Sequence, residues 1–213
     1  FPDDVARRQG AKPSKVTRFP GLKEEIYLRP REHPKLEQRS KPLAVVRPEA
    51  GYATYQSEPN PLLPLTIEHL LAQGADVVLM PRGKEQREAL AEKWGSKVTV
   101  LAEAVDGPAI LADADLFVGA GGTMCREAAV VGTPAFSIYW GDSPAVDRHL
   151  ESLGLLQVLK SEDDVQVIEV GTKTKVDRAD GSGGTRKAVV SAIDSFARSH
   201  IETFASRSAP SAM

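Results

Sequence analysis

Residues 116–134 read LFVGAGGTMCREAAVVGTP, and they are the clearest indication of the fold. It opens with a short apolar strand at 116–118 and then passes through the glycine-rich run 119–122. A helix is predicted over residues 123–131, and it stops at Gly132, because glycine is a common residue just past a helix end. Glycine adopts backbone conformations that other residues avoid, so the chain can turn sharply from strand to helix. The stretch therefore predicts one strand–turn–helix unit of an α/β protein.

The same alternation of strand and helix continues on both sides of this unit. Short apolar runs of strand length alternate with segments whose apolar residues recur every three or four positions, as in amphipathic helices. The predicted strands cover residues 43–46, 76–80, 97–101, 116–118, 134–139 and 155–159, and the predicted helices cover 62–73, 84–94, 107–112, 123–131 and 144–153. Such βαβ units build a parallel sheet with right-handed connections. We therefore predict an α/β fold with a Rossmann-like parallel sheet and helices on both faces.

The pattern divides the chain into a connector, a Rossmann-like domain, a glycine-rich loop with a C-terminal helix, and a disordered tail. These regions cover residues 1–42, 43–170, 171–205 and 206–213, respectively. The connector is rich in charge and in proline, which breaks helices, and it contains one predicted strand at 16–19. The run 181–184 is glycine-rich, but it follows no strand and lacks a correctly spaced lysine, so we predict a flexible loop there. The C-terminal helix is predicted over 185–205.

The composition argues against several classes of function. Lys and Arg number 27 and Asp and Glu 29, a net charge of -2, so no basic excess favours nucleic-acid binding. No apolar stretch approaches the roughly 20 residues that a membrane-spanning helix needs. Cys125 is the single cysteine, which excludes an internal disulfide, and the four histidines lack metal-ligand spacing. We therefore expect a cytoplasmic protein without a metal site or a transmembrane segment.

The glycine-rich turn is also the candidate ligand site. The start of a helix carries unpaired N–H groups and the positive end of the helix dipole, and both favour a phosphate. Glu127 follows Gly122 by five residues, where its carboxylate can accept two hydrogen bonds from a diol such as ribose. The alternative is structural: the glycines make a tight turn, and Glu127 compensates the helix dipole. The glycines fit neither Gly-x-Gly-x-x-Gly nor a Walker loop, which argues against NAD and ATP.

Several short motifs occur together in a fixed order along about the first 160 residues. They are GLKEEIYL at 21–28, Arg47-Pro48, Pro81-Arg82 and GGTMCREA at 121–128. In this combination the chain resembles a microbial family known as domain of unknown function 354. The glycine-rich turn with its glutamate also resembles the donor site of GT-B-fold glycosyltransferases, especially the peptidoglycan N-acetylglucosamine transferase. It is similar as well to the non-hydrolysing UDP-N-acetylglucosamine 2-epimerases.

The resemblance implies a site for a nucleotide sugar of the UDP-N-acetylhexosamine type, which would be a donor substrate and not a cofactor. Glu127 would hold the ribose, and the loop 101–105 would contact the uracil, mostly through backbone groups. The diphosphate would bind the backbone amides of Gly121, Gly122, Thr123 and Met124. GT-B donors are generally bound without a metal, because the helix dipole and arginines offset the charge of the leaving group.

Arg47 and Arg82 follow the first two strands of the domain, so both side chains are expected to converge on phosphate oxygens, which arginine binds in bidentate fashion. The alternative for each is a surface ion pair. Tyr52 and Tyr55 either stack on the sugar or base or merely pack. Asp142 either contacts hydroxyls of the donor sugar or caps a turn.

The resemblance leaves the reaction open. The epimerase motif His-Arg-x-Glu-Asn corresponds here to 46–50, VRPEA, which keeps Arg47 and Glu49 but lacks the histidine and the asparagine. In GT-B enzymes the catalytic base generally comes from an N-terminal domain, and residues 1–28 resemble only the end of such a domain. No catalytic residue is therefore assigned. The chain begins with Phe1, and we expect a partial chain that is inactive without its N-terminal domain as partner.

Three functions stand as alternatives. The first is the donor-binding half of a glycosyltransferase, and the second is an epimerase acting at C2 of the sugar. The third is a non-catalytic nucleotide-binding or scaffold module, which turnover by the isolated chain would reject. Neither the acceptor nor the oligomeric state follows from the sequence, and a homo-oligomer is possible.

Overall fold

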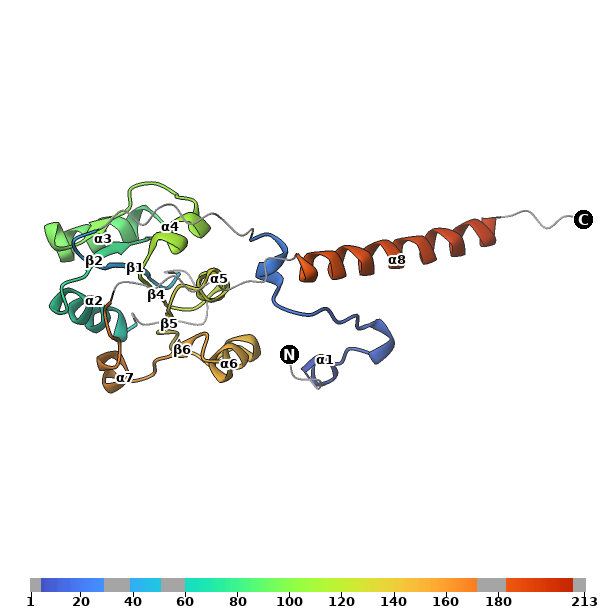
Figure 1. Cartoon of the computed structure of the whole chain (residues 1–213), viewed down its shortest axis with the longest axis horizontal. Helices are drawn as coiled ribbons and strands as arrows, with labels where there is room; N and C mark the ends of the chain where they lie inside the picture. Colours follow the sequence, from blue (N-terminus) through green and yellow to red (C-terminus); the bar gives the residue numbers. More distant parts are fainter. Residues whose placement is uncertain (1–4, 29–38, 51–59, 172–182, 209–213) are drawn as a thin grey trace, which may run out of the picture. The chain divides into compact units, whose positions relative to one another are not determined.

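The computed structural model describes residues 5–28, 39–50, 60–171 and 183–208, with the side chains of residue 200 and residues 202–208 left out. The chain forms two compact units (Figure 1). The main unit is residues 30–179, and the second unit combines residues 2–29 with residues 180–213. Tyr52, Tyr55 and part of the glycine-rich run 181–184 lie outside the described residues, as do residues 209–213 of the predicted tail.

The main unit is built on one six-stranded sheet in which every strand is parallel to its neighbours. The strands are β1 (Leu43–Arg47), β2 (Asp76–Leu79), β3 (Thr99–Val100), β4 (Leu116–Gly119), β5 (Ala135–Ser137) and β6 (Gln157–Val158). Their order in the sheet is β3-β2-β1-β4-β5-β6. This is the doubly wound Rossmann order, with its switch point between β1 and β4. The predicted fold class is confirmed, and each strand ends within two residues of its predicted bounds.

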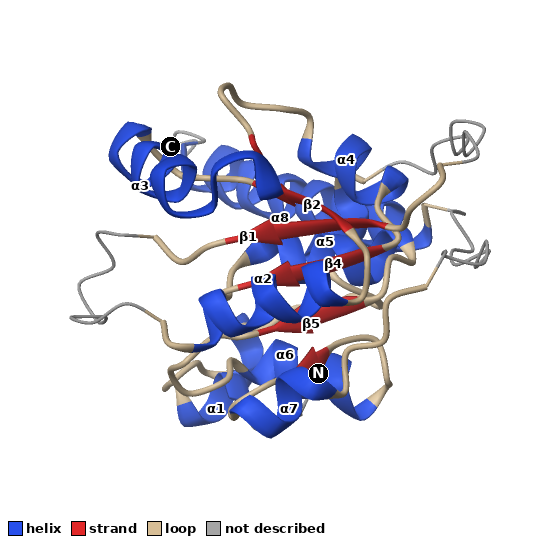
Figure 2. Cartoon of the chain, turned by 90° about the vertical axis from the view of Figure 1, so that its left-hand side faces the viewer, coloured by secondary structure: helices blue, strands red, loops and turns tan. Residues whose placement is uncertain are grey.

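Six helices of the main unit connect or follow these strands. They are α2 (Leu62–Ala72), α3 (Lys84–Trp94), α4 (Gly107–Asp113), α5 (Thr123–Val131), α6 (Ala145–Ser152) and α7 (Glu162–Gln166), with a 3-10 turn, η3 (Gly95–Lys97), after α3. In Figure 2, α2 crosses one face of the sheet and α5 lies behind the other. The predicted bounds of α3 and α5 agree with the structure, α2 and α4 differ from theirs by one residue at one end, and α6 differs by one residue at each end.

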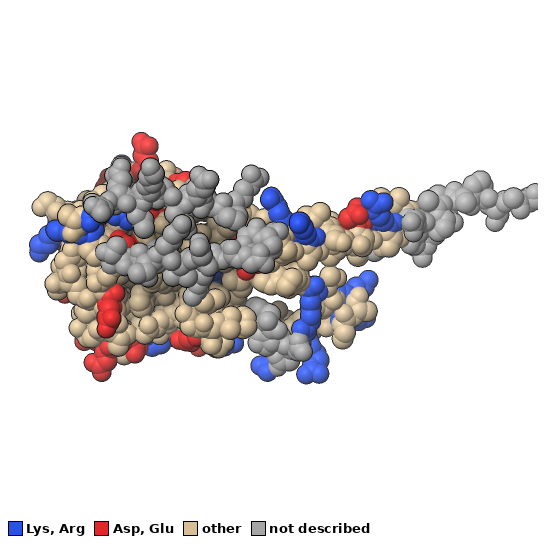
Figure 3. Space-filling model, in the orientation of Figure 1, with Lys and Arg blue, Asp and Glu red and all other residues tan. Residues whose placement is uncertain are grey.

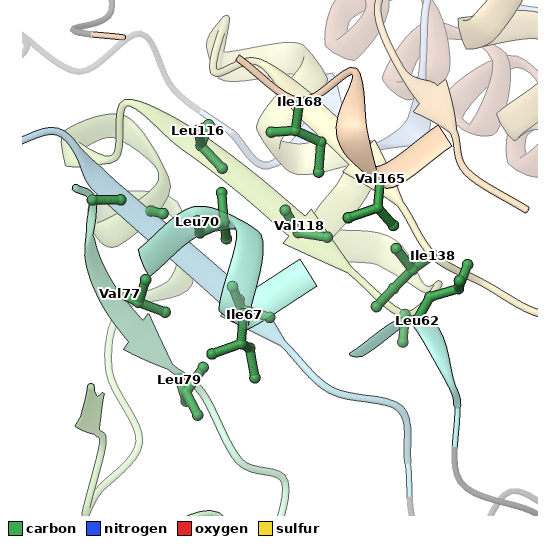
Figure 4. Close-up of a cluster of buried hydrophobic side chains, with 14 of the residues drawn as sticks. Leu62, Ile67, Leu70, Val77, Leu79, Leu116, Val118, Ile138, Val165 and Ile168 are labelled. Carbon is green, nitrogen blue, oxygen red and sulfur yellow. The ribbon is translucent and has the colours of Figure 1, made fainter. Parts of the chain in front are cut away.

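The core explains why the strands are so apolar. Side chains alternate between the two faces of a strand, and both faces of this sheet are covered. On one face, Ile67 and Leu70 of α2 pack over strand residues such as Val77 and Val118 (Figure 4). Phe117, which precedes Val118 in β4, is fully buried on the other face of the sheet, where its ring lies close to Gly119.

The described residues of the second unit contain four helical elements. They are α1 (Val5–Arg8), the 3-10 turns η1 (Pro13–Lys15) and η2 (Lys23–Ile26), and α8 (Gly184–Ser208). The predicted strand at 16–19 is wrong: Val16 closes η1, and residues 17–19 form no ladder. A strand needs a partner for its backbone groups, which β-forming residues alone do not supply. Helix α8 continues three residues past its predicted end, so residues 206–208 are helical.

The start of α8 is bound to the connector within this second unit. Thr185 Oγ1 donates a hydrogen bond to Glu25 Oε2 of η2. A carboxylate beside the first turn of a helix also offsets the positive end of the helix dipole. This contact joins two segments that lie 160 residues apart in the sequence.

Two surface properties bear on partners. In Figure 3, acidic and basic side chains are scattered over the visible face of the main unit, and the side chains described on that face form no continuous basic patch. Of the helices in the described part of the chain, none combines the length and the apolar character that crossing a lipid bilayer requires.

Candidate functional site

The candidate site lies at the carboxyl edge of the sheet, around the switch point between β1 and β4. Ligands of open α/β sheets bind in the crevice at such a point. Arg47, the last residue of β1, pairs in register with Gly119, the last residue of β4. The segment after β2 begins at Met80, and its backbone N–H bonds Val46 O at 2.9 Å. The sheet therefore brings the ends of β1, β2 and β4 side by side.

The turn after β4 requires its glycines for three different reasons. Gly121 and Gly122 have φ angles of 85° and 95°, a region that residues with side chains rarely adopt. A Cβ on Gly121 would lie 2.8 Å from Cδ2 of Tyr139, so the aromatic ring packs directly on the turn. A Cβ on Gly119 would lie 2.7 Å from Cys125 Sγ, so this glycine allows α5 to approach the strand.

Helix α5 begins directly after this turn and presents its positive end to the site. Gly122 occupies the N-cap position and provides no side-chain cap, and the first turn contains no acidic residue. At the other end, Gly132 closes the helix with a φ of 79° and a backbone N–H bond to Ala129 O at 3.3 Å. A helix start without a side-chain cap suits an anion, because its amides and dipole remain uncompensated by side chains.

Both predicted arginines lie at this turn. Arg47 Nη1 donates to the sulfur of Met124, in the first turn of α5, at 3.1 Å. Arg82 Nε donates to the carbonyl oxygen of Pro48 at 3.1 Å, and its Nη2 lies 3.7 Å from the position of a Cβ on Gly122. The two guanidinium groups therefore flank the glycine turn from the β1 and β2 side.

The surroundings of Arg47 disfavour its charged form. The pKa of Arg47 is lowered by burial and, next, by the positive charge of Arg82, while the negative charge of Glu127 acts in the opposite direction. Glu127 is thus close enough to act on Arg47. Among the described residues, neither Arg47 nor Arg82 forms an ion pair with a carboxylate within 4.0 Å. The surface ion pairs considered as an alternative are therefore not formed with described residues.

A small hydrogen-bond network holds the segment after β1 against its neighbours. Gln86 of α3 accepts from the backbone N–H of Arg82 at 2.8 Å and donates to the carbonyl of Glu49 at 2.9 Å. Asn60, which is buried, donates to Ile138 O at 2.6 Å, and its backbone N–H donates to Glu49 Oε1 at 3.2 Å. Sequence patterns gave no indication of Gln86 or Asn60, because one resembles any surface helix residue and the other lies in a loop.

The loop 101–105 lies at the edge of the sheet after β3, three strands from β4. Arg87 of α3 donates to the carbonyl of Ala102 at 2.7 Å. At the far end of the loop, a Cβ on Gly107 would lie 3.8 Å from Cε of Met124. Gly107, which begins α4, therefore lies beside the side chain of Met124 in the first turn of α5.

Two residues inside the GGTMCREA motif face away from the site. Arg126 Nε lies 2.7 Å from Oδ1 of Asp147 on α6, and the two side chains are 15% and 2% exposed. Cys125 is fully buried, and burial, followed by the negative charge of Asp147, raises the pKa of its thiol from 9.0 to about 12. Asp142 is exposed in the loop after β5. Arg126 and Cys125 thus have structural roles.

Taken together, the fold and this edge define a class: a Rossmann-like half with a glycine turn, a helix start and an arginine pair at its switch point. Within that class, the chain belongs to the family described as "Protein of unknown function (DUF354)", whose model matches residues 5–197.

The chain is similar to one curated relative and to several solved structures. Uncharacterized protein MJ0665 of Methanocaldococcus jannaschii is 34% identical over 110 residues, which are 51% of this chain and 31% of that protein. The chain thus spans about a third of the relative's length.

Several solved structures are similar to part of this chain at low sequence identity. They include a UDP-GlcNAc 2-epimerase from Methanocaldococcus jannaschii (TM-score 0.46, 9% identity, covering 71% of this chain and 46% of that one). Another is the glycotransferase of kitacinnamycin (TM-score 0.49, 19% identity, covering 71% of this chain and 40% of that one). A third is LpCGTa in complex with UDP (TM-score 0.38, 18% identity, covering 70% of this chain and 34% of that one).

Proposed function

We propose that this chain is the nucleotide-sugar-binding half of a GT-B-like glycosyltransferase, with a UDP-N-acetylhexosamine as donor substrate. One observation carries the proposal: Arg47 and Arg82 flank a helix start that lacks a side-chain cap, and neither forms an ion pair with a described carboxylate. Two adjacent cations repel each other, and a diphosphate between them would relieve this repulsion. The site therefore suits a ligand with at least two negative charges.

Each residue of the site has a distinct role in this proposal. The guanidinium groups of Arg47 and Arg82 bind the diphosphate oxygens, and the backbone amides of 121–124 bind them from the side of α5. Glu127, which acts electrostatically on Arg47, accepts hydrogen bonds from the ribose hydroxyls. During transfer, negative charge builds up on the leaving diphosphate, and the same groups stabilise it without a metal.

The acceptor and the catalytic base belong to another part of the protein in this proposal. The chain spans only 31% of the relative's length, and no catalytic base is assigned among its residues. We therefore expect this chain to bind the donor without turning it over. A two-domain arrangement, in which the reaction takes place between the halves, is the simplest way to complete the enzyme.

Calorimetric titration with UDP, UMP and uridine tests this proposal. Arg47→Gln and Arg82→Gln should each weaken UDP binding by about 10- to 100-fold, because each removes a charge-assisted hydrogen bond to phosphate. Uridine, which has no phosphate, should bind the wild type and both variants equally weakly.

Arg198→Gln is the matched control, because it removes the same charge from an exposed position on α8. Its UDP affinity should equal that of the wild type. If Arg47→Gln and Arg82→Gln bind UDP as tightly as Arg198→Gln does, the arginine pair is not a diphosphate site and the proposal fails.

A further inference from the structure

Trp140 is unusual among the large side chains near the site, because 53% of its surface is exposed. It follows β5, on the far side of β4 from the two arginines. The other tryptophan, Trp94, is only 7% exposed and belongs to the core. An exposed indole costs solvation free energy, and such a side chain beside a binding site is a common contact for a ligand.

The backbone on both sides of Trp140 is held by one cation. Lys160 Nζ donates to the carbonyl oxygen of Tyr139 at 2.6 Å and to that of Gly141 at 2.7 Å. Lys160 is itself fixed, because its backbone N–H donates to Asp164 Oδ2 at 2.8 Å, in the capping box that starts α7. The exposed indole is thus attached to a stretch of chain with little freedom to move.

The same stretch is in contact with the glycine turn. The ring of Tyr139 fills the space where a Cβ on Gly121 or on Gly141 would lie, at 2.8 Å and 2.7 Å from its nearest atoms. Lys160 Nζ also lies 5.7 Å from the centroid of this ring, within the range of a cation–π interaction. Tyr139 therefore couples the position of the Trp140 backbone to the turn at which a diphosphate would bind.

We propose that Trp140 is the surface on which the sugar ring of the donor stacks, and that Lys160 and Tyr139 are positioning residues that hold it beside the diphosphate. This inference rests on the proposed function. The C–H face of a pyranose is apolar and matches an indole, while its edge carries hydroxyls that need polar partners. Asp142, exposed two residues after Trp140, offers a carboxylate for such hydroxyls. The arginines lie on the other side of the turn, so the sugar extends from the terminal phosphate toward β5.

Comparing UDP with UDP-N-acetylglucosamine separates the sugar contact from the nucleotide contact. Trp140→Ala should weaken binding of UDP-N-acetylglucosamine by about five- to tenfold, the usual effect of losing an aromatic stack, and leave UDP binding unchanged. Trp140→Phe should retain most of the affinity. Leu153→Ala is the matched control, because Leu153 is equally exposed (56%) but precedes β6 at the opposite edge of the sheet.

Fluorescence tests the positioning role in a Trp94→Phe background, where Trp140 is the only tryptophan. Lys160→Met should lower the anisotropy of Trp140 and weaken UDP-N-acetylglucosamine binding severalfold without changing UDP binding, because the indole is no longer held. Lys160→Arg, which keeps the cation, should restore both readouts. A merely structural lysine would affect both ligands alike.

Three outcomes decide the matter. Selective loss of UDP-N-acetylglucosamine binding in Trp140→Ala supports the inference. Equal losses for both ligands, or no loss for either, overturn it and leave the proposed function intact. Absence of UDP binding by the wild type overturns the proposed function, and the inference with it.

Discussion

Cys125 lies in the middle of the ligand-site motif, yet its thiol has no exposed surface. Burial raises its pKa to about 12, so the reactive thiolate is nearly absent at pH 8. We therefore expect a disulfide reagent such as DTNB to react with the native chain at least about 100-fold more slowly than with the chain unfolded in urea. Absorbance at pH 8 measures both rates. Comparable rates in the two states would contradict the burial of this residue.

Arg47 and Arg82 show how far single positions can be interpreted from sequence. Each follows an apolar strand, and parallel strands end at one edge of a sheet, so their convergence near the glycine turn could be predicted. Their partners could not: the sulfur of Met124 and the carbonyl of Pro48 depend on side-chain rotamers and loop geometry. The sequence analysis also did not predict Trp140 as a ligand contact, because the exposure of a single side chain after a strand leaves no periodic pattern in the sequence.

At the scale of elements, the positions of the helices and strands were predicted mainly from the periodicity of apolar residues. Helices α3 and α5 have their predicted bounds because each ends at a glycine after a regular run of residues. The predicted strand at 16–19 was wrong because a β-strand forms only when a neighbouring strand accepts its backbone hydrogen bonds. Residues with high β propensity form no ladder when no neighbouring strand is available.

The ion pair between α5 and α6 provides a test at this scale. Asp147→Ala leaves Arg126, which is only 15% exposed, without its partner, and should lower the free energy of unfolding by about 3 kcal/mol. Asp194→Ala breaks a pair of the same type with Arg198 on the surface of α8 and should cost less than about 0.5 kcal/mol. Urea denaturation measures both. Equal effects would show that the buried pair does not hold the two helices together.

At the scale of the whole molecule, one sheet edge collects the candidate ligand contacts. The ends of β1, β2, β4 and β5 carry, in order, Arg47, Arg82, the glycine turn and Trp140. The fold class follows from the alternation of elements along the sequence, since parallel βαβ units leave few topologies, whereas the order of the strands in the sheet came from the structure. The reaction does not follow from this arrangement, because a fold and a binding edge do not define the chemistry carried out there.

In the proposed function, UDP binds at the glycine turn between β1, β2 and β4. Hydrogen exchange, followed by mass spectrometry with and without saturating UDP, tests this binding site because it locates the ligand on the chain. We expect slower exchange in residues 119–127, whose amides would bind the diphosphate, and no change in the turn 73–75 at the opposite edge of the sheet. Unchanged exchange at 119–127 while UDP is bound, or protection confined to other segments, would show that UDP does not bind at the glycine turn.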